Sequence, residues 1–234
     1  LVVTLHYSAL QFLGCHEYFH LANGHCELVN YLGMNTIEEM TGNALVNEGL
    51  FLQTLEYDAD CASVSVVIGA AITRSLNDDL DTLDKKAGYV SSAVLGIYFT
   101  IRVFWSLSKT SILDLDKSTH PHPSIRLRYC LEIVLALLGK FYNAEDANYI
   151  IDKIISNILL IEDELGAQNE VFPKILRESY TPLATKHSIK IINNRIDVAE
   201  KLKPFSHRKL EVSSKLDERV AFDDELRQIL VKQE

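Results

Sequence analysis

Residues 15–20 of the chain read Cys-His-Glu-Tyr-Phe-His and lie within a series of apolar residues at helical spacing. The apolar positions are Leu5, Leu10, Leu13, Phe19, Leu21 and Leu28. This spacing predicts one amphipathic helix of roughly 25 residues. We expect it to end between Asn30 and Asn35, where Asn, Gly and Thr residues gather.

His16 and His20 give this helix the residue types of a metal site. Four residues of an α-helix turn through about 40° beyond one full turn, so both imidazoles can reach one Zn²⁺ from the same face. Glu17, between them, lies close enough to polarise a metal-bound water. His-Glu-x-x-His arises by chance in roughly a few chains per hundred, so it needs support from elsewhere. The alternative is two ordinary helix histidines.

The rest of the chain also shows helical periodicity and weak strand signals. We predict helices over residues 45–76, 89–108, 124–138 and 146–165. A charged turn at residues 77–86 and a His-Pro loop at residues 109–123 separate three of them. Beyond residue 169, Pro173, Pro182 and Pro204 are expected to divide the remainder into shorter helices. The predicted fold class is mainly α, with any small sheet lying upstream or being minor.

The composition of the chain limits the classes of function that it can have. The 234 residues are 47% hydrophobic and 24% charged, as in ordinary globular proteins. The net charge of −9 and the absence of long Lys or Arg runs disfavour a nucleic-acid partner. Four cysteines without a CxxC pair predict reduced thiols rather than a thiolate zinc site. Residues 88–107 are apolar except for Arg102 and several Ser and Thr, which favours a core helix over a membrane span.

A catalytic zinc needs three protein ligands and one open position. One known arrangement places Gly three residues and His six residues after the second motif His, but here those positions hold Asn23 and Cys26. His25 is one residue out of register, which rotates it by about 100° on a continuous helix. His25 is therefore not expected to be the third ligand.

A carboxylate from the second long helix is the better third ligand. Glu56 and Asp60 are four residues apart and share a face. We predict that Glu56 binds the metal while Asp60 accepts the second ring N–H of a ligating His. Asp58 is next in line as ligand. The alternative is a solvated acidic stripe, because exposed carboxylates are common.

These motifs together resemble a known family. His-Glu-Tyr-Phe-His at residues 16–20, followed by Glu-Tyr-Asp-Ala-Asp at residues 56–60, is similar to the gluzincin metallopeptidases of the CAAX-protease and HtpX type. In that family the Glu of the second motif completes the zinc site and the Asp supports a ligating His. The resemblance therefore implies a zinc ion held by His16, His20 and Glu56. It also implies a supporting role for Asp60.

A third element of the family is also present. Thr119-His120-Pro121 is followed by Arg126, six residues after the His. The resemblance implies that His120 and Arg126 steady the oxyanion formed during peptide hydrolysis or help to hold the site together. The alternative is a solvent-facing loop. His122 departs from the pattern, since the family often has Pro or a small residue there.

The resemblance covers about residues 8–130 and says little about residues 140–234. Residues 16–25 are also similar to soluble bacterial peptidases of the phage-exclusion Lit type. Clear transmembrane helices, usual in the HtpX branch, are missing. We therefore expect a cytoplasmic protein, with membrane association as a weaker alternative.

The sequence thus predicts a zinc-dependent endopeptidase acting on a protein or peptide substrate, with Glu17 as general base. We expect the catalytic domain at residues 1–140 and a helical accessory region at residues 141–234, unless both form one domain. The main alternative is a structural zinc, or a degenerate site, in a helical protein-binding module. A regulatory metallopeptidase of the anti-repressor type ranks lower. The substrate, the cleavage site and the oligomeric state stay open.

Overall fold

The computed structural model describes residues 2–34, 46–77, 82–108, 111–166 and 171–207. The described helices are α1 (Val2–Ala22), α2 (His25–Tyr31), α3 (Val46–Asn77), α4 (Leu83–Leu107), the 3₁₀ helix η1 (Ile112–Lys117), α5 (Pro123–Phe141), α6 (Ala144–Glu164), α7 (Val171–Ser179) and α8 (Pro182–Leu202). No strand occurs within these ranges, which confirms the prediction of a mainly α fold.

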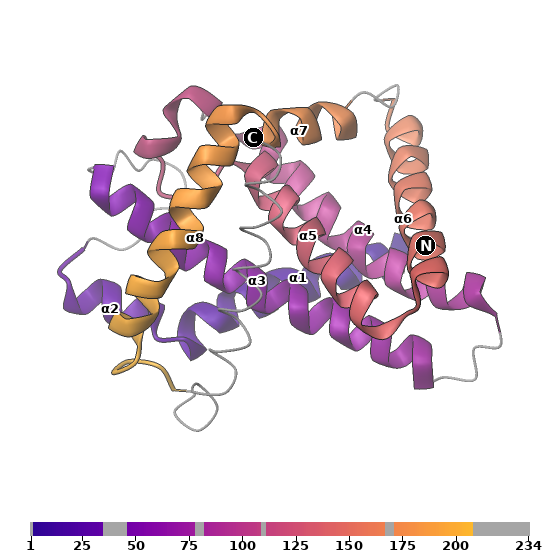
Figure 1. The fold of residues 1–234 in the computed structure, drawn as a ribbon, viewed down its shortest axis with the longest axis horizontal. Coiled ribbons are helices and arrows are strands. Elements are labelled where there is room, and N and C mark those ends of the chain that lie inside the picture. The colour runs from indigo at the N-terminus through magenta and orange to yellow at the C-terminus, as the bar shows by residue number, and fades with distance from the viewer. Residues whose placement is uncertain (1, 35–45, 78–81, 109–110, 167–170, 208–234) are drawn as a thin grey trace.

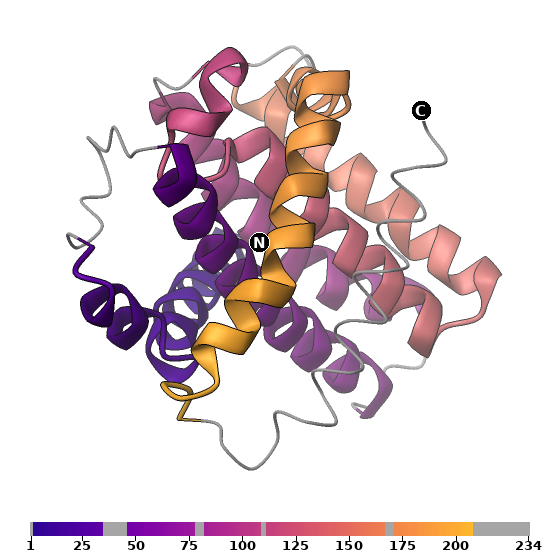
Figure 2. The same cartoon turned by 60° about the vertical axis from the view of Figure 1, so that its left-hand side comes forward.

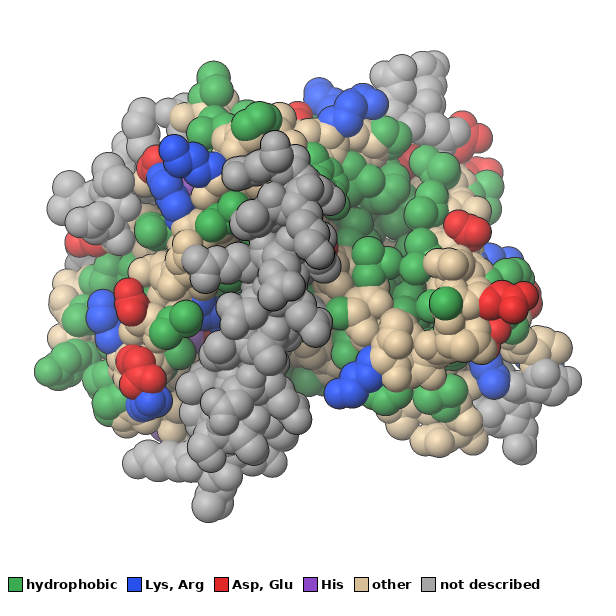
Figure 3. Space-filling model, in the orientation of Figure 1, with side chains coloured by type: hydrophobic (Ala, Val, Ile, Leu, Met, Phe, Trp, Pro, Cys, Tyr) green, Lys and Arg blue, Asp and Glu red, His purple; other side chains and the backbone are tan. Residues whose placement is uncertain are grey.

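The long helix α3 runs through the molecule and is covered by helices from both halves of the chain (Figure 1). α1 packs against α3 and α4, and α4 also packs against α6. α5 lies along α3, and α8 crosses α3 from the other end of the sequence (Figures 1 and 2). On the described part of the face in Figure 3, acidic and basic side chains are interspersed.

Two buried clusters hold these helices together. The larger contains apolar side chains from all the long helices, among them Phe12, Ile68, Ile97, Ile133, Ile150 and Ile191. A smaller cluster joins α2, α3 and the end of α8 through Leu28, Leu52, Leu55, Val198 and Leu202. Burial of these side chains, at roughly 1.5–3 kcal/mol each, fixes α1, α2 and α8 around α3.

The prediction of one continuous helix through Leu28 is wrong. α1 ends at Ala22, and α2 begins at His25 after Gly24, whose φ is 79°. A Cβ on Gly24 would lie 2.5 Å from the carbonyl carbon and oxygen of Phe205. Both the left-handed conformation and this close approach therefore require glycine. The break redirects the chain, so that α2 no longer follows the α1 axis.

The other predicted helices are present, with shifted ends. α3 and α6 lie within two residues of their predicted bounds. α4 begins six residues before residue 89, because the Thr82 hydroxyl caps its first turn. Pro173 does not divide a helix; it lies in the first turn of α7, where a missing N–H costs nothing. Pro182 begins α8, as the sequence indicates.

Among the described helices, two are long and apolar enough to cross a membrane, residues Glu48–Asn77 of α3 and Leu83–Leu107 of α4. More than half of the apolar window in each is buried against other helices. In α4, Arg102 Nε donates to Glu162 Oε1 at 3.1 Å, and Tyr98 Oη donates to the same oxygen at 2.6 Å. The charge within the apolar segment is thus paired inside the protein. All four cysteines are free thiols.

The C-terminal helices pack on the rest of the described structure. In α8, Asn194 Nδ2 donates to Thr54 Oγ1 on α3 at 3.0 Å, and His187 Nε2 lies 2.7 Å from Gln53 Oε1. The boundary predicted at residue 140 falls within the last turn of α5. Helix α8 therefore packs against the middle of α3.

Gly96 marks the crossing of α4 over α1. A Cβ there would lie 2.5 Å from Ser8 Cβ and 2.7 Å from Ala9 N. We expect Gly96→Ala to lower the free energy of unfolding by about 1–3 kcal/mol, because the helices must separate. Gly88→Ala in the same helix meets nothing within 4 Å and should raise it by about 0.5–1 kcal/mol. Thermal unfolding followed by circular dichroism tests both, and equal stability of the two variants would contradict the close crossing.

Candidate metal centre

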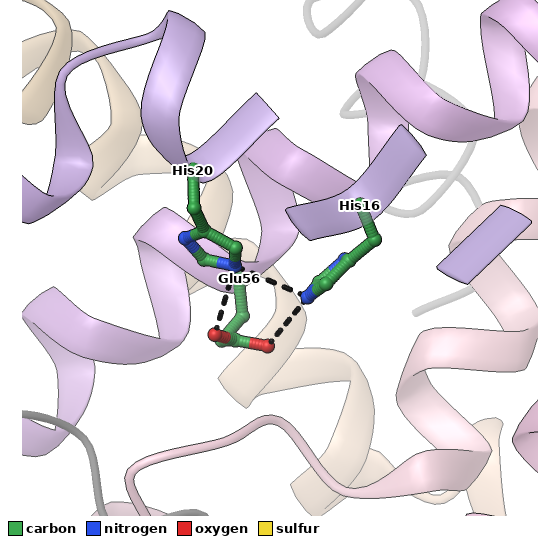
Figure 4. Close-up of side chains that lie close together, drawn as sticks. All are labelled: His16, His20 and Glu56. Atoms are coloured by element: carbon green, nitrogen blue, oxygen red, sulfur yellow. Dashed lines mark hydrogen bonds and ion pairs between the residues drawn. The ribbon is translucent and has the colours of Figure 1, made fainter. Parts of the chain in front are cut away.

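His16 and His20 of α1 face Glu56 of α3 (Figure 4). Glu56 Oε2 lies 3.4 Å from His16 Nε2, and Glu56 Oε1 lies 3.2 Å from His20 Nε2. The two Nε2 atoms are 3.1 Å apart. All three side chains are buried. The two imidazoles approach different oxygens of Glu56, and one ligand atom from each of the three residues lies within 4.8 Å of the others, so this group could hold a metal ion.

The spacing of these atoms fits a metal ion at their centre. Tetrahedral bonds of about 2.0–2.1 Å separate neighbouring ligand atoms by roughly 3.4 Å. The two Nε2 atoms are 3.1 Å apart, close to that value, and each has a different Glu56 oxygen at 3.2 or 3.4 Å. The Glu56 carboxylate is 3% exposed, and a buried carboxylate needs a cationic partner. A cation bound by His16, His20 and Glu56 would provide it.

The charge balance around α3 leads to the same conclusion. Glu56 and Asp60 are both buried, and Arg126 is the permanent cation that contacts both, with Nη2 2.8 Å from Asp60 Oδ1 and Nη1 4.0 Å from Glu56 Oε2. Burial opposes a charge on His16, but Asp60 and Glu56 outweigh it and raise the pKa of His16 from 6.5 to about 10. In the metal-free protein a proton on His16 therefore supplies the second positive charge. A bound metal would replace that proton.

Asp60, predicted to accept the second ring N–H of a ligating histidine, lies beside His16. Asp60 Oδ1 is 2.9 Å from His16 Nδ1, an ion-pair contact rather than a well-aligned hydrogen bond. Arg126 donates to both Asp60 oxygens at 2.8 Å, and Tyr129 Oη donates to Oδ2 at 2.5 Å. Burial raises the pKa of Asp60, but Arg126 and His16 outweigh it and hold the pKa well below its usual range. Asp60 is therefore a fixed carboxylate beside the outer nitrogen of His16.

The His-Pro loop brings His120 to the edge of the centre. His120 Nε2 lies 3.7 Å from Glu56 Oε1, and its side chain is 22% exposed, more than those of the three ligand candidates. Gln53 anchors the loop, because its Nε2 donates to Leu115 O at 2.8 Å and to Ser118 O at 2.7 Å. His120 therefore approaches the metal group from the side nearest solvent.

His122, whose role the sequence left open, caps a helix. It precedes α5, and its Nδ1 accepts a hydrogen bond from Ser124 N at 3.3 Å and lies 2.7 Å from Ser124 Oγ. This cap fixes the first turn of α5, which carries Arg126.

Glu17 is the one catalytic candidate that the structure does not bring into contact with the others. Its side chain is exposed on α1, between the two histidines in sequence. Within the described ranges no ion pair joins it to His16, His20 or Arg126. Its role as general base stays a prediction.

Asp58 has a different environment from the one considered for it as an alternative ligand. Asn23 Nδ2 donates to Asp58 Oδ2 at 2.6 Å, and Arg195 Nη2 donates to Asp58 Oδ1 at 3.2 Å. Asp58 Oδ2 also lies 3.3 Å from His25 Nε2. Asp58 is not part of the group of ligand atoms around Glu56.

His25 and Arg195 also belong to this region, and neither was predicted from the sequence. His25 Nδ1 lies 3.0 Å from His20 Nδ1, on the side of the ring opposite Glu56. Burial lowers the pKa of His25, although Asp58 opposes that shift. The Asn23-Gly24 dipeptide is a turn signal that would have exposed the helix break. Nothing in the local sequence around Arg195 indicates its contact with α3.

Comparisons with models of protein families, with curated proteins and with solved structures found no match. The resemblance to the gluzincin peptidases therefore rests on the motifs in the sequence.

We expect Glu56→Ala to lose bound metal, because it removes the only carboxylate ligand of the group. Zinc is the probe, and its content after equilibrium dialysis should fall from about one ion per chain to near none. Glu162→Ala is the matched control, since Glu162 is also buried but belongs to the Tyr98 and Arg102 network. It should retain zinc. Unchanged zinc in Glu56→Ala would show that another residue is the third ligand.

Proposed function

We propose that the protein is a zinc-dependent peptidase. The observation that carries this proposal is the buried convergence of His16 Nε2, His20 Nε2 and the Glu56 carboxylate, in which the two Nε2 atoms are 3.1 Å apart and each lies within 3.4 Å of one carboxylate oxygen. Two imidazoles and one carboxylate form a ligand set that suits Zn²⁺, and three protein ligands leave one of four positions open. An open position is what distinguishes catalytic zinc from structural zinc.

The position of His120 supports an open fourth site. A closed centre would need a fourth ligand atom at the same spacing as the other three. His120 Nε2 is 3.7 Å from Glu56 Oε1 but does not belong to the compact group. It can therefore donate a hydrogen bond to water or substrate at the open side instead of binding the metal.

The residues around the centre can each take a different role in peptide hydrolysis. Zinc, when bound, would supply Lewis-acid polarisation of water and of the scissile carbonyl. Glu17 accepts the proton of the attacking water and then passes it to the leaving amine as the C–N bond breaks. His120 donates to the negative charge that develops on the carbonyl oxygen. Glu17 is exposed, and this scheme requires its side chain to turn towards the open side of the site.

Arg126 has a different part in this scheme from His120. Its Nε and Nη2 are both engaged by Asp60 at 2.8 Å, and only Nη1 faces Glu56, at 4.0 Å. Arg126 is 6% exposed. Arg126 therefore holds Asp60 in place and adds positive charge near Glu56, instead of reaching the substrate directly. Breaking such a buried pair costs about 3–5 kcal/mol.

A structural metal in a helical binding module is the second candidate. The observation that favours it is the burial of all three ligand side chains, each less than one-tenth exposed. A structural metal would need a fourth protein ligand and would have no use for Glu17. The two candidates therefore differ in what the loss of Glu17 changes.

We expect Glu17→Ala to abolish hydrolysis while leaving zinc bound. Removing a general base costs about 10²–10⁴ in rate, and Glu17 is not a proposed ligand. The assay uses zinc-loaded protein with casein and quenched-fluorescent peptide mixtures, with zinc content measured on the same samples. Glu164→Ala, an exposed glutamate at the end of α6, is the matched control and should keep full activity.

Two outcomes would contradict the peptidase proposal. Hydrolysis by Glu17→Ala at the rate of the unmodified protein would exclude Glu17 as the base. A protein that binds one zinc but cleaves none of the substrates would favour the structural metal.

A further inference from the structure

We propose that His25 and Asp58 are positioning residues that fix the ring of His20 for metal binding. This inference rests on the proposed metal centre and adds a second supporting arm to it. The arm runs from α1 through α2 to α3: His20 Nδ1 lies 3.0 Å from His25 Nδ1, and His25 Nε2 lies 3.3 Å from Asp58 Oδ2. All three side chains are at most one-tenth exposed.

Metal binding by His20 determines where each proton of this arm lies. A His20 Nε2 that binds a metal has no proton, so the single proton of the neutral ring is on Nδ1. That proton can be donated only if His25 Nδ1 is an acceptor. The proton of His25 is then on Nε2, the nitrogen that faces the Asp58 carboxylate. The proton positions of the three groups are therefore consistent with one another, and the contact between His25 Nε2 and Asp58 Oδ2 is an ion-pair contact rather than a well-aligned hydrogen bond.

The last member of the chain is held from the opposite side. Arg195 of α8 donates to Asp58 Oδ1 through Nε at 3.3 Å and Nη2 at 3.2 Å. Asn23 Nδ2 donates to Asp58 Oδ2 at 2.6 Å. Asp58 is thus an acceptor at each of these contacts, and Arg195 balances its charge in the interior.

The two imidazoles of the centre are then supported in related ways. His16 Nδ1 faces Asp60 directly, whereas His20 Nδ1 reaches Asp58 through His25. The helix break at Gly24 makes the second arm possible, because on a continuous helix His25 would point away from His20. A partner for the outer nitrogen of a ligating histidine is typically worth about 10–100-fold in metal affinity.

A buried histidine can also be an ordinary member of the core, and His187 provides the comparison. It is 3% exposed, lies 2.7 Å from Gln53 Oε1 and 3.4 Å from Asp116 Oδ1, and has no contact with His16 or His20 among the described residues. Replacing His187 removes a buried, paired imidazole without touching the proposed arm.

The first test is zinc affinity, measured by competition with a chromogenic chelator. We expect His25→Leu to weaken zinc binding about 10–100-fold, because His20 Nδ1 loses its acceptor. His25→Asn should recover most of that loss, since its amide oxygen can accept near the position of Nδ1. His187→Leu should bind zinc like the unmodified protein. Equal zinc affinity of His25→Leu and the unmodified protein would overturn the inference, as would an affinity of His25→Asn as low as that of His25→Leu.

The second test needs no variant and is therefore independent of folding defects. Histidine ¹H–¹⁵N NMR spectra of the zinc-loaded protein should show a proton on Nδ1 of His20 and on Nε2 of His25. A proton on Nδ1 of His25 would overturn the inference even with zinc bound. A protein that takes up no zinc would instead refute the proposed function itself, and the supporting arm with it.

Discussion

Two buried carboxylates one helical turn apart, Glu56 and Asp60 of α3, set the main constraint on this structure. A buried negative charge is stable only beside positive charge and hydrogen-bond donors, so the surrounding helices must supply them. α1 contributes His16 and His20, and α5 contributes Arg126. Arg126 neutralises one of the two charges, and the other requires either a proton on His16 or a metal ion. The metal centre and the packing of α1 on α3 thus depend on the same interaction.

A third carboxylate of α3, Asp58, extends this constraint to the C-terminal half. It faces Arg195 of α8 on one side and His25 of α2 on the other. Helix α8 also contacts α3 through Asn194 and Thr54, and it contacts η1, just before the loop that carries His120, through Lys190 and Asp116. Helix α8, which lies in the region expected to be an accessory, therefore supports the candidate metal centre. Loss of α8 would leave Asp58 without its main cation and the His120 loop with fewer supports.

Sequence periodicity was sufficient to predict the helical fold and the pairing of His16 and His20 with Glu56. Residues four apart share a helix face whatever the tertiary structure. The pair His16 and His20 and the pair Glu56 and Asp60 could therefore each be recognised from their own segment of the sequence. The arm through His25 was missed because a continuous helix was assumed across Gly24, whose conformation depends on Phe205 far along the chain. Arg195 was missed for the same reason: its partner on α3 is 137 residues away. Long-range contacts of this kind have no local signal in one sequence.

The most direct measurement is a crystal structure of the zinc-loaded protein with anomalous data collected at the zinc edge. We expect one anomalous peak per chain, at about 2.0–2.2 Å from His16 Nε2, His20 Nε2 and a Glu56 oxygen. We also expect a non-protein ligand at the fourth position. A peak bound by Asp58 or Cys26, a fourth protein ligand closing the centre, or no peak between α1 and α3 would contradict it.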